Sequence, residues 1–193
     1  MEGTMAQKDN RFFNFNASKF GLWVGLASIT MMFAAFSSAY MVRQAAGNWL
    51  EFQLPSMFFY STAVLLLSSI LLQMSYTSFV KEHFNTYKTL MLLTFLLGLV
   101  FVVLQYEAWM QMFEMGIDLK RNPSGSFVYV ISGVHAAHVL GGVAVLIVAL
   151  IHAFFLPKIV TERRKNRFQL VLYYWHFVDI LWVYLLLFFV FQR

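Results

Sequence analysis

Five long stretches of this chain contain almost no charged residue, and this feature most constrains how the chain folds. Residues 20–42, 52–80, 89–106 and 122–157 contain no Lys, Arg, Asp or Glu, and residues 168–192 contain only Asp179. A helix needs about 20 mostly apolar residues to cross the hydrocarbon core of a bilayer. The pattern therefore predicts an all-α integral membrane bundle of five transmembrane helices, near residues 20–42, 55–78, 89–113, 126–156 and 169–192.

The composition excludes several classes of protein. Only 12% of the residues are charged, whereas about a quarter are charged in a soluble domain, so a soluble globule would lack the polar residues to cover its surface. The chain has no cysteine, which excludes a disulfide framework, a thiolate metal site and a covalently attached c-type haem. We expect a polar cytoplasmic tail over residues 1–18 and a single membrane domain over residues 19–193.

The basic residues predict the orientation in the membrane. Ten of the 14 Lys and Arg residues lie in the N-terminal tail and in the second and fourth expected loops, and the other four lie on the opposite side. Basic loops remain on the cytoplasmic side of a membrane. We therefore expect the N-terminus inside and the C-terminus outside.

Six ionisable side chains fall within the expected spans, where such groups are costly and usually face the bundle interior in pairs. They are Glu107, His135, His138, His152, His176 and Asp179. Spacings of three residues place His135 with His138, and His176 with Asp179, on shared helix faces. Two pairings follow as hypotheses: Asp179 with His176 or with a histidine of the fourth helix, and Glu107 with His135.

Two interpretations of the histidines remain open at this point. Imidazoles on facing helices ligate haem in many membrane cytochromes, and His152 and His176 are the best candidate pair because both lie toward the inner side. The other interpretation is structural, with buried histidines hydrogen-bonded to carboxylates or carbonyls. An absorption spectrum of the isolated chain separates them.

Small residues recur every four positions on two of the expected helices. Gly21 and Gly25 make one such step, and Gly133, Ala137 and Gly141 make another. Small residues at this spacing let helix backbones approach closely. Such a face serves either to dock a partner subunit or to pack helices within the chain. A catalytic set is not visible in the sequence, because it has no glycine-rich phosphate loop, no paired carboxylates and no loop long enough to form a soluble catalytic domain.

Several segments resemble subunit III of the haem–copper respiratory oxidases, the cytochrome c oxidase subunit III family. Residues 175–179 read Trp–His–Phe–Val–Asp, similar to the family's terminal-helix signature, and residues 133–142 read Gly–Val–His–Ala–Ala–His–Val–Leu–Gly–Gly, similar to its preceding helix. Residues 98–105, 19–40 and 62–69 resemble three earlier helices. The likeness covers nearly the whole chain from Lys19 onward and corresponds to a short form, with the last five of the family's seven helices.

The resemblance implies a subunit without catalytic residues, metal or cofactor in a terminal oxidase that reduces O2 to water and pumps protons. It implies direct contact with catalytic subunit I, subunit II in the same complex, bound phospholipid, a role in sustained proton uptake, and a place in the bacterial inner membrane and in a larger respiratory supercomplex. The catalytic subunit of the family needs six histidines and this chain has five; the subunit with a dinuclear copper centre needs cysteines and this chain has none.

The resemblance also implies a set of buried polar or lipid-cleft residues: Gln105, Glu107, His135, His138, Trp175, His176 and Asp179. Ile29 stands where many members carry a membrane-buried glutamate, so a proton-related role of that carboxylate does not carry over. Alternatives are subunit III of a quinol oxidase or of a related nitric oxide reductase, a small bis-histidine haem cytochrome, and a membrane scaffold without a respiratory role.

Overall fold

The structure is a computed structural model that describes residues 17–117, 119, 122–155 and 159–192. It contains five long helices in these residues: α1 (Ala17–Ala45), α2 (Met57–Val80), α3 (Phe84–Glu114), α4 (Pro123–Phe155) and α5 (Glu162–Phe191). Each helix is long and apolar enough to cross a membrane. The prediction of an all-α protein with five membrane helices is thereby confirmed. The expected tail, residues 1–18, falls almost entirely outside the described residues.

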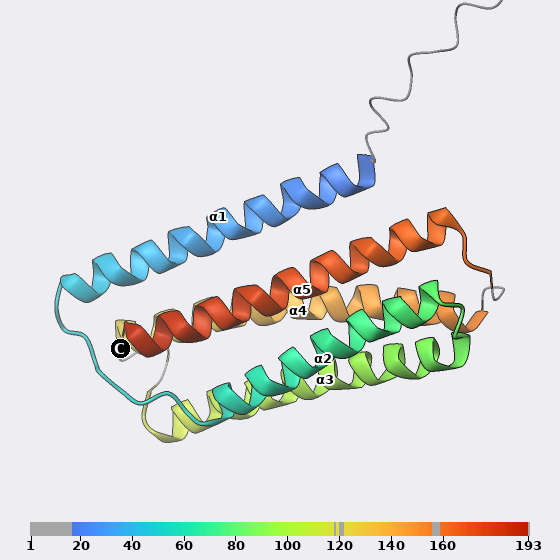
Figure 1. The fold of residues 1–193 in the computed structure, drawn as a ribbon. Coiled ribbons are helices and arrows are strands. Elements are labelled where there is room, and N and C mark those ends of the chain that lie inside the picture. The colour runs from blue at the N-terminus through green and yellow to red at the C-terminus, as the bar shows by residue number, and fades with distance from the viewer. Residues whose placement is uncertain (1–16, 118, 120–121, 156–158, 193) are drawn as a thin grey trace, which may run out of the picture.

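Successive helices run in opposite directions (Figure 1). The start of α1, the α2–α3 loop and the α4–α5 loop lie at one end of the bundle, which we call the loop-2/4 end. The α1–α2 connection, the α3–α4 loop and the C-terminus lie at the other end. All the loops expected to be basic therefore share one end with the start of the first described helix.

The helices α1, α3 and α5 are longer than their uncharged stretches, because they continue into the polar ends. α5 begins at Glu162 rather than near residue 169. Its N-cap is Thr161, whose hydroxyl accepts a hydrogen bond from the backbone N–H of Arg164 at 3.3 Å, and a salt bridge of 2.9 Å joins Glu162 to Lys165 on the first turn. A hydroxyl N-cap and an i,i+3 ion pair both favour helix over loop.

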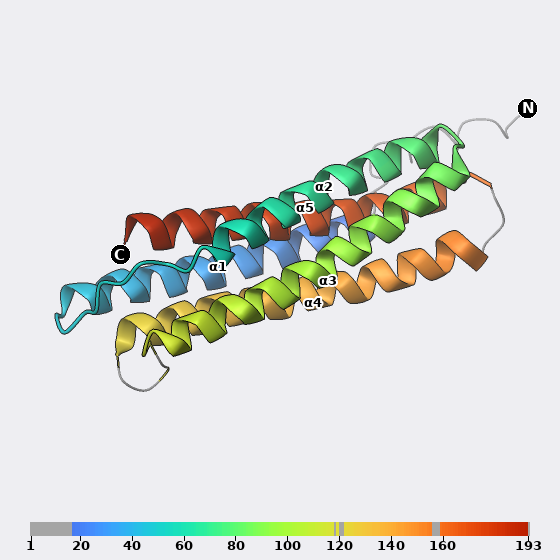
Figure 2. The same ribbon diagram turned by 90° about the horizontal axis from the view of Figure 1, so that it is seen from below.

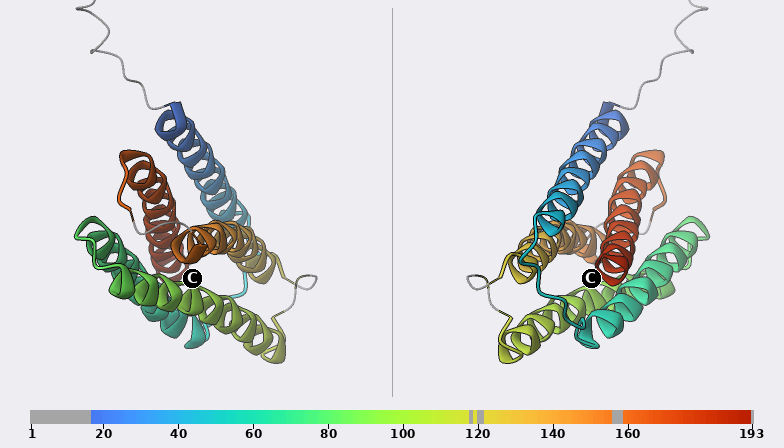
Figure 3. Two further views of the ribbon diagram at one scale, coloured as in Figure 1. Left: turned by 90° about the vertical axis from the view of Figure 1, so that its right-hand side faces the viewer. Right: turned by 90° about the vertical axis from the view of Figure 1, so that its left-hand side faces the viewer.

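The bundle is uneven (Figures 1 and 3). α2 and α3 form a hairpin that packs along its length, and α4 and α5 pack against this hairpin. α1 lies on the far side and contacts α4 and α5 only, as far as the described residues go. Much of the surface of α1 is therefore open to whatever surrounds the chain.

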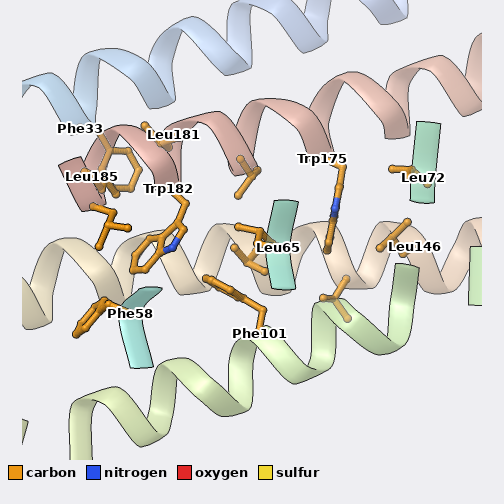
Figure 4. Packing of buried hydrophobic residues seen from close by; sticks show 14 of the residues in the cluster. Phe33, Phe58, Leu65, Leu72, Phe101, Leu146, Trp175, Leu181, Trp182 and Leu185 are labelled. Atoms are coloured by element: carbon orange, nitrogen blue, oxygen red, sulfur yellow. The ribbon is translucent and has the colours of Figure 1, made fainter. Parts of the chain in front are cut away.

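The core lies where α2, α3, α4 and α5 meet, and aromatic rings dominate it (Figure 4). Trp182 of α5 is fully buried; it stacks on Phe58 of α2 with ring centroids 5.9 Å apart and meets Phe101 of α3 edge-on at 5.5 Å. Aromatic pairs in these geometries add to the stability gained from burial alone. α5 is thus the central element of the fold.

Candidate functional site

Trp175 occupies a slot formed by two glycines on different helices. A Cβ atom on Gly98 of α3 would lie 2.9 Å from the Cη2 atom of Trp175. A Cβ atom on Gly142 of α4 would lie 3.0 Å from the Cε3 and Cζ3 atoms of the same ring. The indole N–H donates a hydrogen bond of 2.9 Å to the hydroxyl of Ser68 on α2. The residue at the start of the terminal-helix signature therefore fixes three other helices around α5.

Trp182 makes a second junction about two turns further along α5. Its indole N–H donates a hydrogen bond of 2.9 Å to the hydroxyl of Thr62 on α2, and its ring stacks on His135 of α4 at 4.8 Å. His135 also meets Phe33 of α1 edge-on at 6.3 Å. Through His135, this junction links α1 to the rest of the bundle.

His135 is fully buried, yet neither ring nitrogen has a hydrogen-bond partner among the described residues. The expected partner, Glu107, is exposed on α3. The hypothesis that Glu107 pairs with His135 is therefore wrong, and Glu107 is not a buried polar residue within this chain. His138 is half-buried and its Nδ1 bonds the backbone carbonyl of Val134, one turn earlier on its own helix.

Asp179 and His176 share a face of α5 but do not bond each other. The Nδ1 atom of His176 bonds the hydroxyl of Ser69, and Nε2 lies 3.3 Å from the side-chain oxygen of Gln73, both on α2. Asp179 is only 2% exposed, and neither of its carboxylate oxygens has a hydrogen-bond partner in the described part of the chain. The Asp179–histidine pairing is therefore wrong as well.

Gln105 of α3 is the third buried side chain whose polar atoms lack a partner among the described residues. Gln105, His135 and Asp179 thus bring three polar groups from three helices into the bundle without an ion pair. A buried polar group without a partner costs roughly 1–3 kcal/mol.

The structure does not bring the two candidate haem ligands into one site. His176 uses both ring nitrogens in contacts with α2, whereas His152 lines a cavity between α4 and α5 that His176 does not line. The described residues contain no group of three or more His, Cys, Asp or Glu side chains able to hold a metal ion.

The predicted small-residue faces point mainly outward. Gly21, Gly25 and Gly133 have no atom of another residue within 4 Å of a Cβ position, and Ala137 is exposed. Gly141 meets only the hydroxyl of Tyr174, at 3.4 Å. The glycines that allow close packing are instead Gly98 and Gly142. Sequence reasoning missed them because it followed the four-residue repeat, and a glycine alone does not show that an aromatic ring of another helix packs against it.

A family model described as cytochrome c oxidase subunit III matches residues 1–192. The chain belongs to the cytochrome c oxidase subunit III family. It is 31% identical over 178 residues to the probable cytochrome c oxidase subunit 3 of Nocardia farcinica. The aligned region covers 87% of this chain and 84% of that protein.

Two further relatives show how wide the family is. The cytochrome c oxidase subunit 3 of Rattus norvegicus is 32% identical over 125 residues, 65% of this chain and 46% of that protein. The cytochrome bo(3) ubiquinol oxidase subunit 3 of Buchnera aphidicola is 28% identical over 172 residues, 87% of this chain and 90% of that protein. The chain is therefore an accessory subunit III of a haem–copper oxidase complex of the respiratory chain, in the short five-helix form.

Proposed function

We propose that this subunit is a cofactor-free support for the catalytic subunit of a proton-pumping terminal oxidase. The observation that carries the proposal is that two signature residues hold helices together. Trp175 holds α5 against three helices, and His176 bonds two side chains of α2. These contacts tie helices together and leave no open coordination site around the rings. Such a chain serves the complex by its shape and its surfaces rather than by moving electrons.

The subunit lies in the bacterial inner membrane with its N-terminus in the cytoplasm. The uneven distribution of Lys and Arg supports this orientation. The absence of cysteine allows a clean test: Asn85→Cys at the loop-2/4 end and Glu51→Cys at the other end are each the single thiol of the chain, and both positions are exposed. In intact cells an impermeant maleimide should label Glu51→Cys only. Labelling of Asn85→Cys alone would reverse the orientation.

Subunit I docks directly on the open faces of the bundle, with subunit II in the same complex and, beyond it, a larger respiratory assembly. The exposure of Glu107 in a membrane helix supports the proposal that a protein lies beside it, because a carboxylate facing lipid is costly. The outward-facing Gly21, Gly25, Gly133 and Ala137 support it too, since small residues allow a neighbouring helix to approach. Phospholipids fill the remaining apolar surface, and the subunit helps the catalytic subunit to keep taking up protons during turnover.

Purification from cells that carry a tagged version of the chain tests the proposal. A haem- and copper-rich partner should co-purify in mild detergent, and the isolated chain should show no haem absorption. Removal of the chain should leave an oxidase that starts at a normal rate but loses activity during turnover. A haem spectrum of the chain alone would instead establish the bis-histidine cytochrome, and purification without an oxidase would establish a free scaffold.

A quinol oxidase is the second candidate, and the similarity to the Buchnera protein favours it. The co-purified complex distinguishes the two: oxygen uptake with reduced cytochrome c identifies a cytochrome c oxidase, and uptake with a quinol identifies a quinol oxidase. Reduction of nitric oxide in place of oxygen would assign the complex to the related reductases.

A further inference from the structure

A line of polar side chains leads from Asp179 to the surface of the bundle. It runs along the contact between α5 and α2, which lie side by side in opposite directions (Figure 2). The Ser69 hydroxyl of α2 bonds Nδ1 of His176. The same hydroxyl lies near the Asp179 carboxyl, although without the geometry of a hydrogen bond. Nε2 of His176 lies 3.3 Å from Oε1 of Gln73. Exposure increases along this line, from buried Asp179 to half-buried His176 and exposed Gln73.

The acceptors in this line fix where its hydrogens lie. An amide oxygen only accepts hydrogen bonds, so the Nε2 atom of His176 that faces Gln73 carries the ring hydrogen. Nδ1 is then the acceptor, and the Ser69 hydroxyl donates to it. The oxygen of Ser69 keeps lone pairs that can accept from a protonated Asp179. A carboxyl, a hydroxyl and an imidazole therefore stand in the order that stepwise proton transfer requires.

The same three groups have a second arrangement, which differs by the position of the protons. The carboxyl proton of Asp179 passes to the Ser69 oxygen while the hydroxyl proton of Ser69 passes to Nδ1 of His176. This leaves a carboxylate and an imidazolium with Ser69 unchanged between them. The imidazolium then releases its Nε2 proton to water beside Gln73, and the reverse steps return a proton to Asp179. Only one proton is exchanged with water, and no bond between heavy atoms changes.

Further polar side chains continue the line toward the loop-2/4 end. Gln169 of α5 donates to the Tyr76 hydroxyl of α2 at 2.8 Å and accepts from the Lys19 ammonium of α1 at 2.8 Å. Gln169 stands two turns before His176 on α5, about 10 Å along the helix axis. Beyond Asp179, by contrast, the residues four and seven positions on are Val183 and Leu186. The polar line therefore leads to the loop-2/4 end rather than to the C-terminal end.

Few other titratable groups lie near Asp179. In the described residues α5 packs against α1, α2 and α4, and α2 contains no Lys, Arg, Asp, Glu or His. His135 of α4 stacks on Trp182, one turn beyond Asp179, but its ring nitrogens have no partner among the described residues. The remaining titratable side chains of these three helices lie near helix ends or bond other groups: Lys19, Tyr40, Arg43, Tyr60, Tyr76, Tyr129, His138 and His152. His176 is thus the titratable group that a hydroxyl connects to Asp179.

We propose that Asp179, Ser69 and His176 form a proton relay, through which the buried Asp179 carboxyl exchanges a proton with the aqueous phase at the loop-2/4 end. Chains of Asp, Glu and His inside membrane bundles serve as proton relays in pumps and transporters. A relay also explains why a carboxyl is buried in this bundle without an ion pair. It goes beyond the supporting role proposed above, because it gives this chain a proton-binding group of its own.

Infrared spectroscopy of the full chain in detergent tests the relay. The carboxyl carbons of the aspartates are isotopically labelled, and the chain has only three: Asp9, Asp118 and Asp179. The band of Asp179 is the one lost in Asp179→Asn. We expect a carbonyl band of a protonated, buried carboxyl, and the rate at which it shifts after transfer to D2O measures proton exchange at Asp179. Absence of this band in both mildly acidic and mildly alkaline buffer would overturn the proposal.

Matched variants identify the route of exchange. Ser69→Ala removes the connecting hydroxyl and should slow the exchange at Asp179 several-fold, whereas Ser69→Thr keeps a hydroxyl and should restore it. Ser61→Ala is the control, because this buried hydroxyl of α2 bonds only the Phe58 carbonyl, and the rate should not change. A variant that merely loosened the bundle would exchange faster, so a slower rate cannot come from misfolding. Equal rates for Ser69→Ala and Ser61→Ala would overturn the relay.

The relay and the proposed function can fail separately. A chain that co-purifies with an oxidase, but whose exchange at Asp179 does not depend on Ser69, would overturn the relay alone. A chain whose exchange depends on Ser69, but which purifies without an oxidase, would overturn the proposed function alone.

Discussion

Gly142→Ala should destabilise the bundle although alanine is the better helix former. The new Cβ would lie 3.0 Å from two ring atoms of Trp175 and 3.2 Å from a ring atom of Tyr174. The indole has little room to give way, because the backbone of Gly98 lies so close on α3 that a Cβ there would be 2.9 Å from the ring. The Ser68 hydroxyl also holds the indole N–H by a hydrogen bond. Overpacking of this kind costs about 1–3 kcal/mol.

The expected net effect follows from two opposing contributions. Replacing Gly by Ala within a helix stabilises it by about 1 kcal/mol, which leaves a net loss of about 0–2 kcal/mol. For a chain of this size, 1 kcal/mol corresponds to roughly 2–4 °C in Tm, so we expect Tm to fall by up to about 8 °C. The assay is thermal unfolding of the purified chain in detergent, followed by circular dichroism.

Two comparisons make this prediction specific. Gly25→Ala is the matched control, because no atom lies within 4 Å of its Cβ position, and its Tm should stay level or rise. In a Trp175→Phe background the clashing ring atoms are gone, so Gly142→Ala should cost little there, with a coupling energy of about 1 kcal/mol. Equal Tm values for Gly142→Ala and Gly25→Ala would refute the description of a tryptophan held between two glycines.

Three further predictions concern single contacts, each measured as the Tm of the chain in detergent. Trp182→Phe removes the hydrogen bond to Thr62 and should cost about 0.5–1.5 kcal/mol from that bond alone; an unchanged Tm would contradict the junction. Asp179→Asn should leave Tm level or raise it, because the buried carboxylate has no partner among the described residues; a marked fall would reveal one. Thr161→Ala removes the N-cap of α5 and should cost about 1 kcal/mol, whereas a Tm equal to that of the parent would place the helix start elsewhere.

The helices were predictable from the sequence because the cost of charge in lipid dominates every other local preference. Uncharged stretches located all five, although α4 begins at Pro123, three residues before the expected start near residue 126. The ends were less predictable, because a basic residue can belong to a helix that protrudes from the membrane. Lys88 lies within α3, with its ammonium 5.0 Å from the centroid of the Phe154 ring, so its charge marks the membrane surface rather than the end of the helix.

The contacts of the buried polar residues could not be predicted, because they depend on helix rotation. An error of one residue turns a side chain by 100° around the axis, enough to move it from the interior to the surface. Glu107 and Ala108 are neighbours, yet Glu107 is exposed and Ala108 is fully buried. Charge complementarity suggested partners for His135 and Asp179, but the rotation of α3 and α5 provides none among the described residues.

The attachment of α1 shows how a helix is held where the hydrophobic effect gives no help. Lipid tails are as apolar as the helix surface, so packing and hydrogen bonds must hold membrane helices together. α1 has such bonds to α5 along its length. Lys19 donates to the Gln169 side chain at 2.8 Å, the Tyr184 hydroxyl donates to Ser37 at 3.0 Å, and Gln44 donates to the backbone carbonyl of Gln192 at 2.9 Å.

These bonds fix the register of α1 but cover only one side of it. Val24, Met31 and Val42 are exposed on α1, with Met31 and Val42 at least 70% exposed. A helix held on one side by polar contacts, and apolar on the other, keeps its orientation when the chain is alone and still offers a surface to another membrane helix. That division suits an accessory subunit, since the contacts that shape the subunit leave this surface of α1 open.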